Sequence, residues 1–197
     1  MRKRKWDDLY KFRRLDEIPW HSGQPDKYLV RLVKEKNIEK GWVLDMCSGD
    51  GTNSIYLASR GFKVIGIDIS PTAVEIARAR CLKRKLSCDY VVGNVLDLKL
   101  GKKFSFVLDR GCFHHISTKK KPNYARLVNG LLKKKGKFFL LCFSEKNPPY
   151  KKNLSREDIR DYFSDYFHIH FIKDSIHKEP SSGRKRYLYA SFMEKKN

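Results

Sequence analysis

The sequence of 197 residues has no apolar run that approaches the roughly 20 residues a membrane-spanning helix needs. Its first residues, MRKRK, lead into the polar stretch Trp6-Asp7-Asp8 and not into the apolar core of a secretory signal. We therefore expect a cytoplasmic protein that has no membrane partner.

The sequence also has no pair of cysteines at the C-x-x-C spacing that is typical of zinc sites and thiol redox motifs. Its five cysteines are odd in number and scattered along the chain: Cys47, Cys81, Cys88, Cys112 and Cys142. We expect them to be reduced, mostly buried thiols, and we expect no bound metal.

Acidic residues are scarce, because 22 Asp and Glu face 43 Lys and Arg, which leaves a formal charge of +21. Such a charge attracts polyanions at moderate salt and is one argument for a nucleic-acid partner. The basic residues occur, however, in short clusters at expected helix ends and turns, where lysine is favourable for other reasons. A nucleic-acid partner is thus the less favoured reading, and the charge says nothing about oligomeric state.

Apolar periodicity after residue 40 predicts strands and helices in alternation. Ser70-Pro71 is typical of a helix start, and Ser155 with Asp158 resembles a capping box. The expected strands cover 42–46, 63–69, 89–95, 104–109, 137–143, 167–174 and 186–193, and the expected helices cover 25–36, 52–60, 71–86, 124–132 and 155–163.

This alternation predicts an α/β fold: a doubly wound, mostly parallel, seven-stranded Rossmann-like sheet with an antiparallel C-terminal strand and helices on both faces. We expect one domain over 1–197, in which 1–40 form an N-terminal lid and helix extension and 41–197 form the core. Ligands of such sheets bind beyond the carboxyl ends of the strands.

A glycine-containing loop follows the first expected strand, in the segment VLDMCSGDGT. Gly49 and Gly51 allow the chain to turn there with a ligand against the backbone. Asp68, at the end of the second strand, can accept hydrogen bonds from both hydroxyls of a ribose. The G-x-G-x-x-G pattern of dinucleotide sites is absent, whereas Asp45 suits an ammonium group, so these residues favour S-adenosylmethionine over a dinucleotide.

Four segments in order resemble the class I S-adenosylmethionine-dependent methyltransferases: VLDMCSGDGT, IGIDIS, FVLDRGCFHHI and LLKKKGKFFLL. The resemblance covers nearly the whole chain and implies S-adenosylmethionine as cofactor. PWHSGQP and DRGCFHHI further resemble the branch that includes thiopurine and tellurite-resistance methyltransferases. This branch implies a small-molecule acceptor.

The resemblance also implies a set of site residues. Cys47 replaces the first glycine of the family's loop, and Asn94 replaces an acidic residue near the adenine, although its carbonyl can still accept a hydrogen bond. The expected catalytic residues are His114, His115 and Asp109. The expected cofactor-binding residues are Trp20, Asp45, Met46, Cys47, Gly49, Gly51, Asp68, Ile69, Asn94, Val95, Asp109 and Arg110.

Other roles remain open for several of these residues. One histidine of the pair can cap a helix while the other packs, and Trp20, Tyr10 and Phe12 can form a lid or only anchor the N-terminal segment. Residues 147–150, NPPY, spell the catalytic motif of amino-group methyltransferases, but they follow the fifth strand instead of the fourth. We interpret them as a rigid turn, in which Tyr150 can line the acceptor pocket or its lid.

Two other functions compete with small-molecule methylation. The charge of +21 is the argument for methylation of RNA or protein. Cys47 in the glycine loop is the argument for a cofactor-binding module without catalysis.

Overall fold

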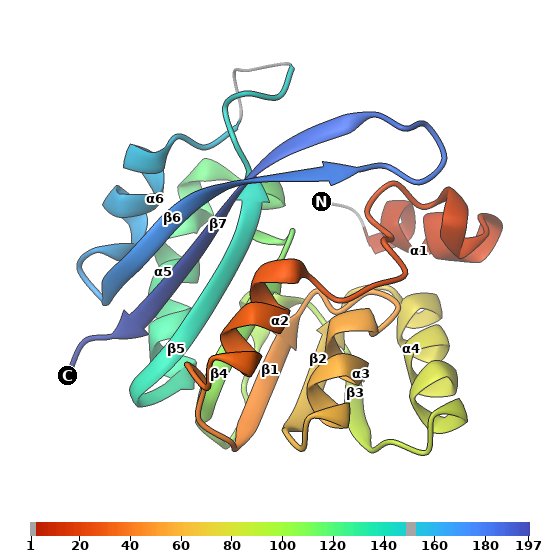
Figure 1. Ribbon diagram of the computed structural model, residues 1–197, viewed down its shortest axis with the longest axis horizontal. Helices are drawn as coiled ribbons and strands as arrows, with labels where there is room; N and C mark the ends of the chain where they lie inside the picture. The colour runs from red at the N-terminus through yellow and green to blue at the C-terminus, as the bar shows by residue number, and fades with distance from the viewer. Residues whose placement is uncertain (1–2, 149–152) are drawn as a thin grey trace.

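The computed structural model describes residues 3–148 and 153–197. Its centre is a seven-stranded sheet in the order β3-β2-β1-β4-β5-β7-β6 (Figure 1). β7 alone runs in the direction opposite to the other six strands, so the predicted mostly parallel sheet is confirmed. The strands are β1 (Trp42–Met46), β2 (Lys63–Asp68), β3 (Cys88–Val92), β4 (Phe104–Arg110), β5 (Leu132–Phe143), β6 (Phe167–Lys178) and β7 (Lys185–Lys195).

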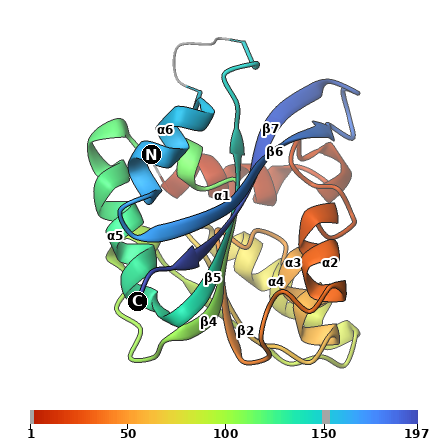
Figure 2. The same ribbon diagram turned by 60° about the vertical axis from the view of Figure 1, so that its left-hand side comes forward.

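Helices cover both faces of this sheet, which gives the three layers seen edge-on in Figure 2. α5 and α6 lie on one side, and α2, α3 and α4 on the other. The helices are α1 (Lys3–Phe12), α2 (Lys27–Lys34), α3 (Thr52–Ser59), α4 (Pro71–Lys83), α5 (Lys121–Leu131) and α6 (Arg156–Phe163).

The central strands are apolar without alternation because both of their faces are covered. In β4, Val107 belongs to the core under α5 and α6, while Phe106 and Leu108 belong to the core under α2 and α3. All three side chains are fully buried. In parallel sheets of this kind, ligands bind among the loops at the carboxyl ends of the strands.

The predicted helix starts are confirmed at two positions. The hydroxyl of Ser70 accepts the Ala73 N–H at 3.0 Å with Pro71 at the first helical position. Ser155 and Asp158 form the reciprocal capping box that begins α6. Each cap satisfies backbone donors that the helix itself leaves free.

The structure differs most from the sequence-based expectation at three elements, while β3, α4 and α5 each differ by three residues at one end. α1 was not predicted, because its ten residues have several charges and only a short apolar stripe. β5 begins at Leu132 and bulges before Lys137, so the basic run between them hides the strand start. β6 continues to Lys178 because it pairs with β7 beyond the expected end. Within the described residues no helix is both long and apolar enough to span a bilayer.

A test of the packing under the loop after β1 is Gly66→Ala in β2. A Cβ there would lie 2.6 Å from Cδ1 of the buried Tyr90 and 2.9 Å from Oγ of Ser48. We expect the free energy of unfolding, measured in urea, to fall by about 1–3 kcal/mol through overpacking.

The matched control is Gly130→Ala in α5, where an added Cβ meets nothing within 4 Å. Because alanine favours helix over glycine, this variant should gain about 0.5–1 kcal/mol. Equal stability of the two variants would contradict the close packing of Tyr90 against Gly66.

Candidate active site

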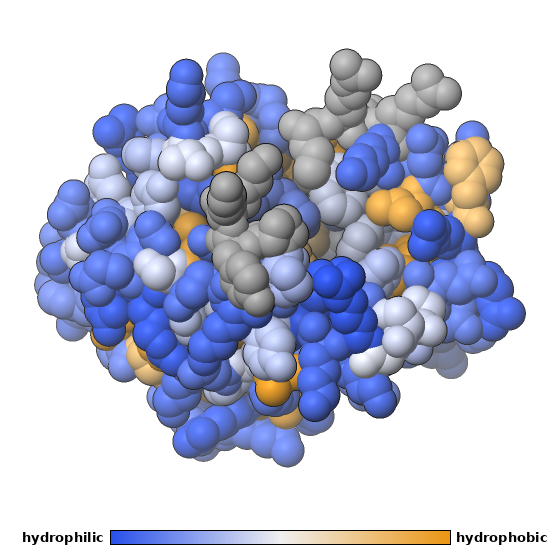
Figure 3. All heavy atoms as spheres, turned by 90° about the horizontal axis from the view of Figure 1, so that it is seen from above, coloured by the Kyte–Doolittle hydropathy of each residue, from blue (hydrophilic) through white to orange (hydrophobic). Residues whose placement is uncertain are grey.

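A cavity of about 760 Å³ opens at the carboxyl ends of the parallel strands. Figure 3 views the molecule from the side toward which β1 and β5 point, where hydrophilic residues dominate and hydrophobic ones appear as small patches. The loops after β2, β3 and β4 line the cavity, and Trp6 and Trp20 line it from the N-terminal segment. A smaller hollow of about 40 Å³ adjoins it beside the loop after β1.

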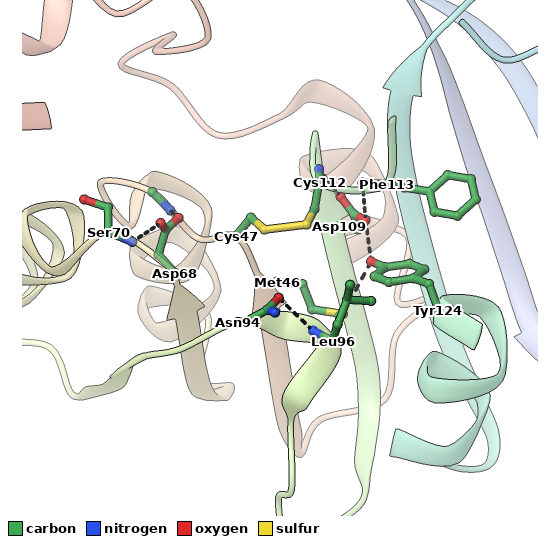
Figure 4. Close-up of a disulfide and its surroundings, with 11 residues drawn as sticks. Met46, Cys47, Asp68, Ser70, Asn94, Leu96, Asp109, Cys112, Phe113 and Tyr124 are labelled. Carbon is green, nitrogen blue, oxygen red and sulfur yellow. Dashed lines mark hydrogen bonds between the residues drawn. A yellow bond between two sulfur atoms is a disulfide. The ribbon is translucent and has the colours of Figure 1, made fainter. Parts of the chain in front are cut away.

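Cys47 and Cys112 form a disulfide between the loops after β1 and β4 (Figure 4). The expectation that all five cysteines are reduced is therefore wrong for this pair. β1 and β4 are parallel neighbours, and their ends bring the two Cα atoms within 5.8 Å, a distance that a disulfide spans. The sequence separation of 65 residues hides this proximity.

No three His, Cys, Asp or Glu side chains of the described residues are arranged to hold a metal ion.

The carboxylate of Asp68 lies in the large cavity, as the sequence predicts for a ribose-binding residue. It accepts the N–H groups of Gly49 and Ser70, both at 2.9 Å, one on each oxygen. Each oxygen therefore retains a lone pair for a ribose hydroxyl. Burial raises the pKa of this carboxyl. Gly49 has φ +54°, and a Cβ on it would lie 2.6 Å from the Tyr10 hydroxyl, so only glycine fits there.

Ile69, Asn94 and Val95 line the same part of the cavity, beside Asp68. The side-chain carbonyl of Asn94 accepts the Leu96 N–H at 3.1 Å, and its amide donates to Asp97 at 2.8 Å. These bonds fix the carbonyl and leave it a second lone pair, which suits an adenine amino group. The structure thus brings these three predicted residues together with Asp68.

Cys47, Trp20 and Arg110 lie where the two hollows meet. Arg110 donates to the Trp20 carbonyl at 3.1 Å, which ties the N-terminal segment to the end of β4. Oγ of Ser48 is buried and has no hydrogen-bond partner among the described residues, and Nε of Arg110 is buried with no hydrogen bond and only a loose ion pair to Asp26 at 3.8 Å. Buried polar atoms without partners are costly, and the carboxylate and ammonium of a methionine chain would satisfy them.

Ser48, His21 and Asp50 are pocket residues that sequence reasoning missed. Nδ1 of His21 lies 2.8 Å from Oδ2 of Asp50 across the small hollow. His21 belongs to the segment PWHSGQP, whose resemblance to the methyltransferase branch does not by itself assign a binding role to this residue. The contact joins positions 29 apart in sequence, and no spacing rule indicates it.

Four predicted site residues do not line either hollow. Asp45 is buried and accepts a hydrogen bond from Ser54 at 2.6 Å, and burial raises its pKa to about 7. Met46 is buried beneath Tyr124. Gly51 starts α3 at φ +77° against Tyr90. The fourth is Asp109.

Asp109 is fully buried and shapes the loop after β4. Its carboxylate accepts the N–H groups of Cys112 at 2.7 Å and Phe113 at 3.0 Å and the hydroxyl of Tyr124 (Figure 4). Burial raises its pKa to about 6 despite these donors. The structure gives Asp109 a positioning role, since it aims the following residues into the cavity without reaching it.

His114 and His115 both line the large cavity, as predicted. The His114 ring stacks on Phe143 with 4.0 Å between ring centroids, and its Nδ1 accepts the Phe143 N–H at 3.3 Å. His115 lies edge-on to Trp6 at 4.9 Å. Burial, first, and the charges of Lys5 and Lys121 lower the pKa of His115 to about 4, and burial lowers the pKa of His114 well below its ordinary value. Both imidazoles are neutral at pH 7.

The N-terminal segment closes over these residues. Nε1 of Trp20 donates to the Tyr10 hydroxyl at 2.9 Å, and the Trp6 and Trp20 rings meet edge-on at 5.1 Å. His177 of β6 lies 2.8 Å from the Pro19 carbonyl. Phe12 is 73% exposed and takes no part in this closure.

Asn147 and Pro148, the two described residues of NPPY, do not line the cavity. Asn147 is buried, and its amide is used by the backbone: it donates to Ser144 at 3.0 Å and accepts from Tyr187 at 2.8 Å. This supports the interpretation as a turn. Tyr150 lies outside the described residues.

Comparison with known proteins agrees with this geometry. The family described as "Methyltransferase domain" matches residues 43–136. An uncharacterized methyltransferase of Schizosaccharomyces pombe is 34% identical over 106 residues, which are 53% of this chain and 73% of that protein. The 2-heptyl-1-hydroxyquinolin-4(1H)-one methyltransferase of Mycobacteroides abscessus is 24% identical over 77% of this chain and 69% of that one.

Two further comparisons bear on length and fold. Uracil methyltransferases of Pyrococcus horikoshii for 23S rRNA and tRNA match over only 22% and 28% of their own lengths. The solved structure titled "Conversion of a Disulfide Bond into a Thioacetal Group during Echinomycin Biosynthesis" superposes with a TM-score of 0.86 at 23% identity, covering 98% of this chain and 92% of that one. The two proteins therefore share a fold although only 23% of their aligned residues are identical.

The chain belongs to the methyltransferases. Its sheet order and its superposition on solved methyltransferases, with a TM-score of 0.75 on the magnesium protoporphyrin IX methyltransferase of Synechocystis at 20% identity, give it the class I methyltransferase fold.

The disulfide can be tested by alkylation of the denatured protein without reductant. We expect iodoacetamide to modify only Cys81, Cys88 and Cys142, and mass spectrometry to find one peptide pair linked through Cys47 and Cys112. After reduction, all five cysteines should react. Five modified cysteines before reduction would contradict the pairing.

The buried carboxylate of Asp45 makes a prediction about pH. Its pKa is about 7 in the folded chain and about 3.9 when unfolded, so the folded state binds more protons between these values. Wild-type stability should fall as pH rises through that window.

Asp45→Asn removes this loss, so its stability relative to wild type should rise by on the order of 2–4 kcal/mol from pH 4 to pH 8 in urea unfolding. The exposed Asp89→Asn is the control and should follow wild type throughout. If the difference in the free energy of unfolding between Asp45→Asn and wild type does not change with pH, the raised pKa of the buried Asp45 is contradicted.

Proposed function

We propose that this enzyme transfers the methyl group of S-adenosylmethionine to a small-molecule acceptor. The observation that carries the proposal is the single cavity that runs from the Asp68 carboxylate to the aromatic and histidine side chains after β4. Asp68 would hold the ribose of the cofactor at the first end, and the methyl group that the cofactor supplies would then be available to an acceptor at the second. The acceptor site is thus enclosed by protein groups on the scale of a small molecule.

In this proposal the cofactor supplies an activated methyl group, and the chain supplies binding and orientation. Asp68 accepts from the ribose, Asn94 from the adenine amino group, and Ser48 and Arg110 bind the methionine end. Trp6 and Trp20 exclude water above the reacting atoms. Holding donor and nucleophile in line in this way can contribute roughly 7–11 kcal/mol to lowering the barrier.

The proposed roles of His114 and His115 follow from their neutral rings. A base whose conjugate acid has a pKa of about 4 removes a proton with little driving force. His114 accepts the Phe143 N–H at Nδ1, so its proton is on Nε2, where it can donate to the acceptor. We therefore assign the pair to orienting the acceptor, and Asp109 to positioning the pair.

Two features of the cavity support a small acceptor over RNA. Its inner end is lined by stacked rings, which suit a flat apolar molecule, and the relative from Mycobacteroides abscessus is named for a hydroxyquinolone acceptor. RNA methylation is the second candidate, supported by the charge of +21 and by the uracil methyltransferases. We further propose that the chain is one domain with 1–40 as its lid, that it acts in the cytoplasm, and that it is not a cofactor-binding module without catalysis.

Cofactor binding is tested by calorimetry with S-adenosylhomocysteine. Asp68→Asn should weaken binding by roughly 10- to 100-fold, because it removes a charged acceptor worth about 1.5–3 kcal/mol. Asp89→Asn, the same change at an exposed position of the neighbouring strand, should bind as wild type does. Binding that is equal in all three proteins would remove Asp68 from the site.

The acceptor class is tested with radiolabelled cofactor. We expect label in small organic products when the enzyme is given a panel of aryl thiols, phenols and amines, and when it is given the low-molecular-weight fraction of a cell extract. Label confined to the RNA or protein fraction would overturn the small-molecule proposal in favour of the second candidate.

A further inference from the structure

Lys121, the first residue of α5, lines the large cavity although it is only 5% exposed. Its Nζ donates to the Ile116 carbonyl at 2.7 Å and lies 5.5 Å from the centre of the Phe113 ring. An ammonium has three N–H donors, and one hydrogen bond leaves two of them free. Among the described residues no carboxylate lies within ion-pair distance of it.

This position is unfavourable for a lysine in two ways. A buried charge without an ion-pair partner is costly, and burial lowers the pKa of the ammonium, although Cys142 and Asp158 act in the opposite direction. The positive end of the α5 dipole repels a cation, yet the first turn has no acidic residue and its N-cap has no side-chain hydrogen bond. Departures from local rules of this kind are expected at functional sites.

Within the part of the chain that the structure describes, the one acidic side chain that acts on the Lys121 charge is Asp158 of α6, which lies beyond ion-pair distance, and the nearer groups add no negative charge. The positive charge of Lys121 lowers the pKa of both His114 and His115, which places the ammonium beside the pair. Both imidazoles are neutral, and Lys120 adds a further positive charge at the same end of the cavity. The carboxylate of Asp68 lines the other end, where the ribose is proposed to bind.

Flat apolar surfaces surround this positive centre. The Phe143 ring stacks on His114 at 4.0 Å, and Trp6 meets His115 at 4.9 Å. A ligand that matches the site has an aromatic ring for these surfaces and a negative charge for Lys121.

Resting on the proposed function, we propose that Lys121 binds the acceptor's nucleophile as an anion, and that the acceptors are aromatic small molecules with an acidic S–H or O–H group. The proton of this group leaves to solvent on binding, so no histidine has to remove it. The anion then forms a bond to the methyl carbon. The bond from that carbon to the sulfonium breaks with its electron pair remaining on sulfur, which yields the neutral thioether S-adenosylhomocysteine and the methylated product.

The test uses 4-nitrophenol, whose anion is coloured, bound to the complex with S-adenosylhomocysteine so that no turnover is needed. In wild type the apparent pKa of the bound probe should be lower than in buffer by about 1–3 pH units, the effect of a close opposite charge. Lys121→Met should abolish this lowering, and Lys121→Arg should restore most of it.

The matched control is Lys119→Met, which removes the same charge from an exposed lysine that does not line the cavity and should behave as wild type. If Lys121→Met does not fold, Lys121→Gln provides the neutral side chain. An unchanged probe pKa in the neutral variant, or no binding of the probe to wild type, would overturn the proposal.

Turnover separates a role in the site from a structural one. Lys121→Met should lower kcat/KM for a thiophenol about 10-fold or more, which corresponds to a shift of one unit in the pKa of the bound thiol. The kcat/KM for aniline, a neutral nucleophile, should stay nearly unchanged. Equal losses for both acceptors, or a larger loss for 4-aminobenzoate than for the thiophenol, would show a structural role or a remote carboxylate contact. If S-adenosylhomocysteine does not bind at all, it is the proposed function that fails.

Discussion

The parallel pairing of β1 with β4 is the constraint on which the whole site depends. It places the loops after these strands side by side, so that Cys47 and Cys112 meet in a disulfide between the two hollows. The same pairing buries Asp109, whose carboxylate collects two backbone N–H groups and the Tyr124 hydroxyl. That network sets the direction in which His114 and His115 leave the strand. The order of the strands thus determines which side chains meet at the ligand site.

Charge is distributed unevenly along the resulting cavity. Asp68, with its two N–H donors, makes the ribose end an acceptor of hydrogen bonds. The opposite end combines two neutral imidazoles with the buried Lys121 and is apolar and positive. In the proposed reaction, Lys121 would hold the nucleophile as an anion beside the methyl group of the cofactor, so that no strong protein base is required.

The sequence predicted most of the fold because its signals are local. The apolar runs of β1 and β4, the cap at Ser70 and the capping box at Ser155 all act within a few residues. Asp68 and Asn94 were placed at the carboxyl ends of strands, and they line the cavity there, because each follows its strand directly. The disulfide, the His21–Asp50 contact and the burial of Lys121 could not be found, since each joins residues from different elements. Asp45 and Asp109 do not line either hollow, since a position in a motif does not tell which way a side chain faces at the end of a strand.

The most direct test of this account is a crystal structure of the protein with S-adenosylhomocysteine. The account predicts the ribose hydroxyls on Asp68, the amino acid end beside Ser48 and Arg110, and the sulfur directed past the Cys47–Cys112 disulfide toward His115 and Lys121. A cofactor bound elsewhere, or one whose sulfur faces away from these two residues, would contradict it.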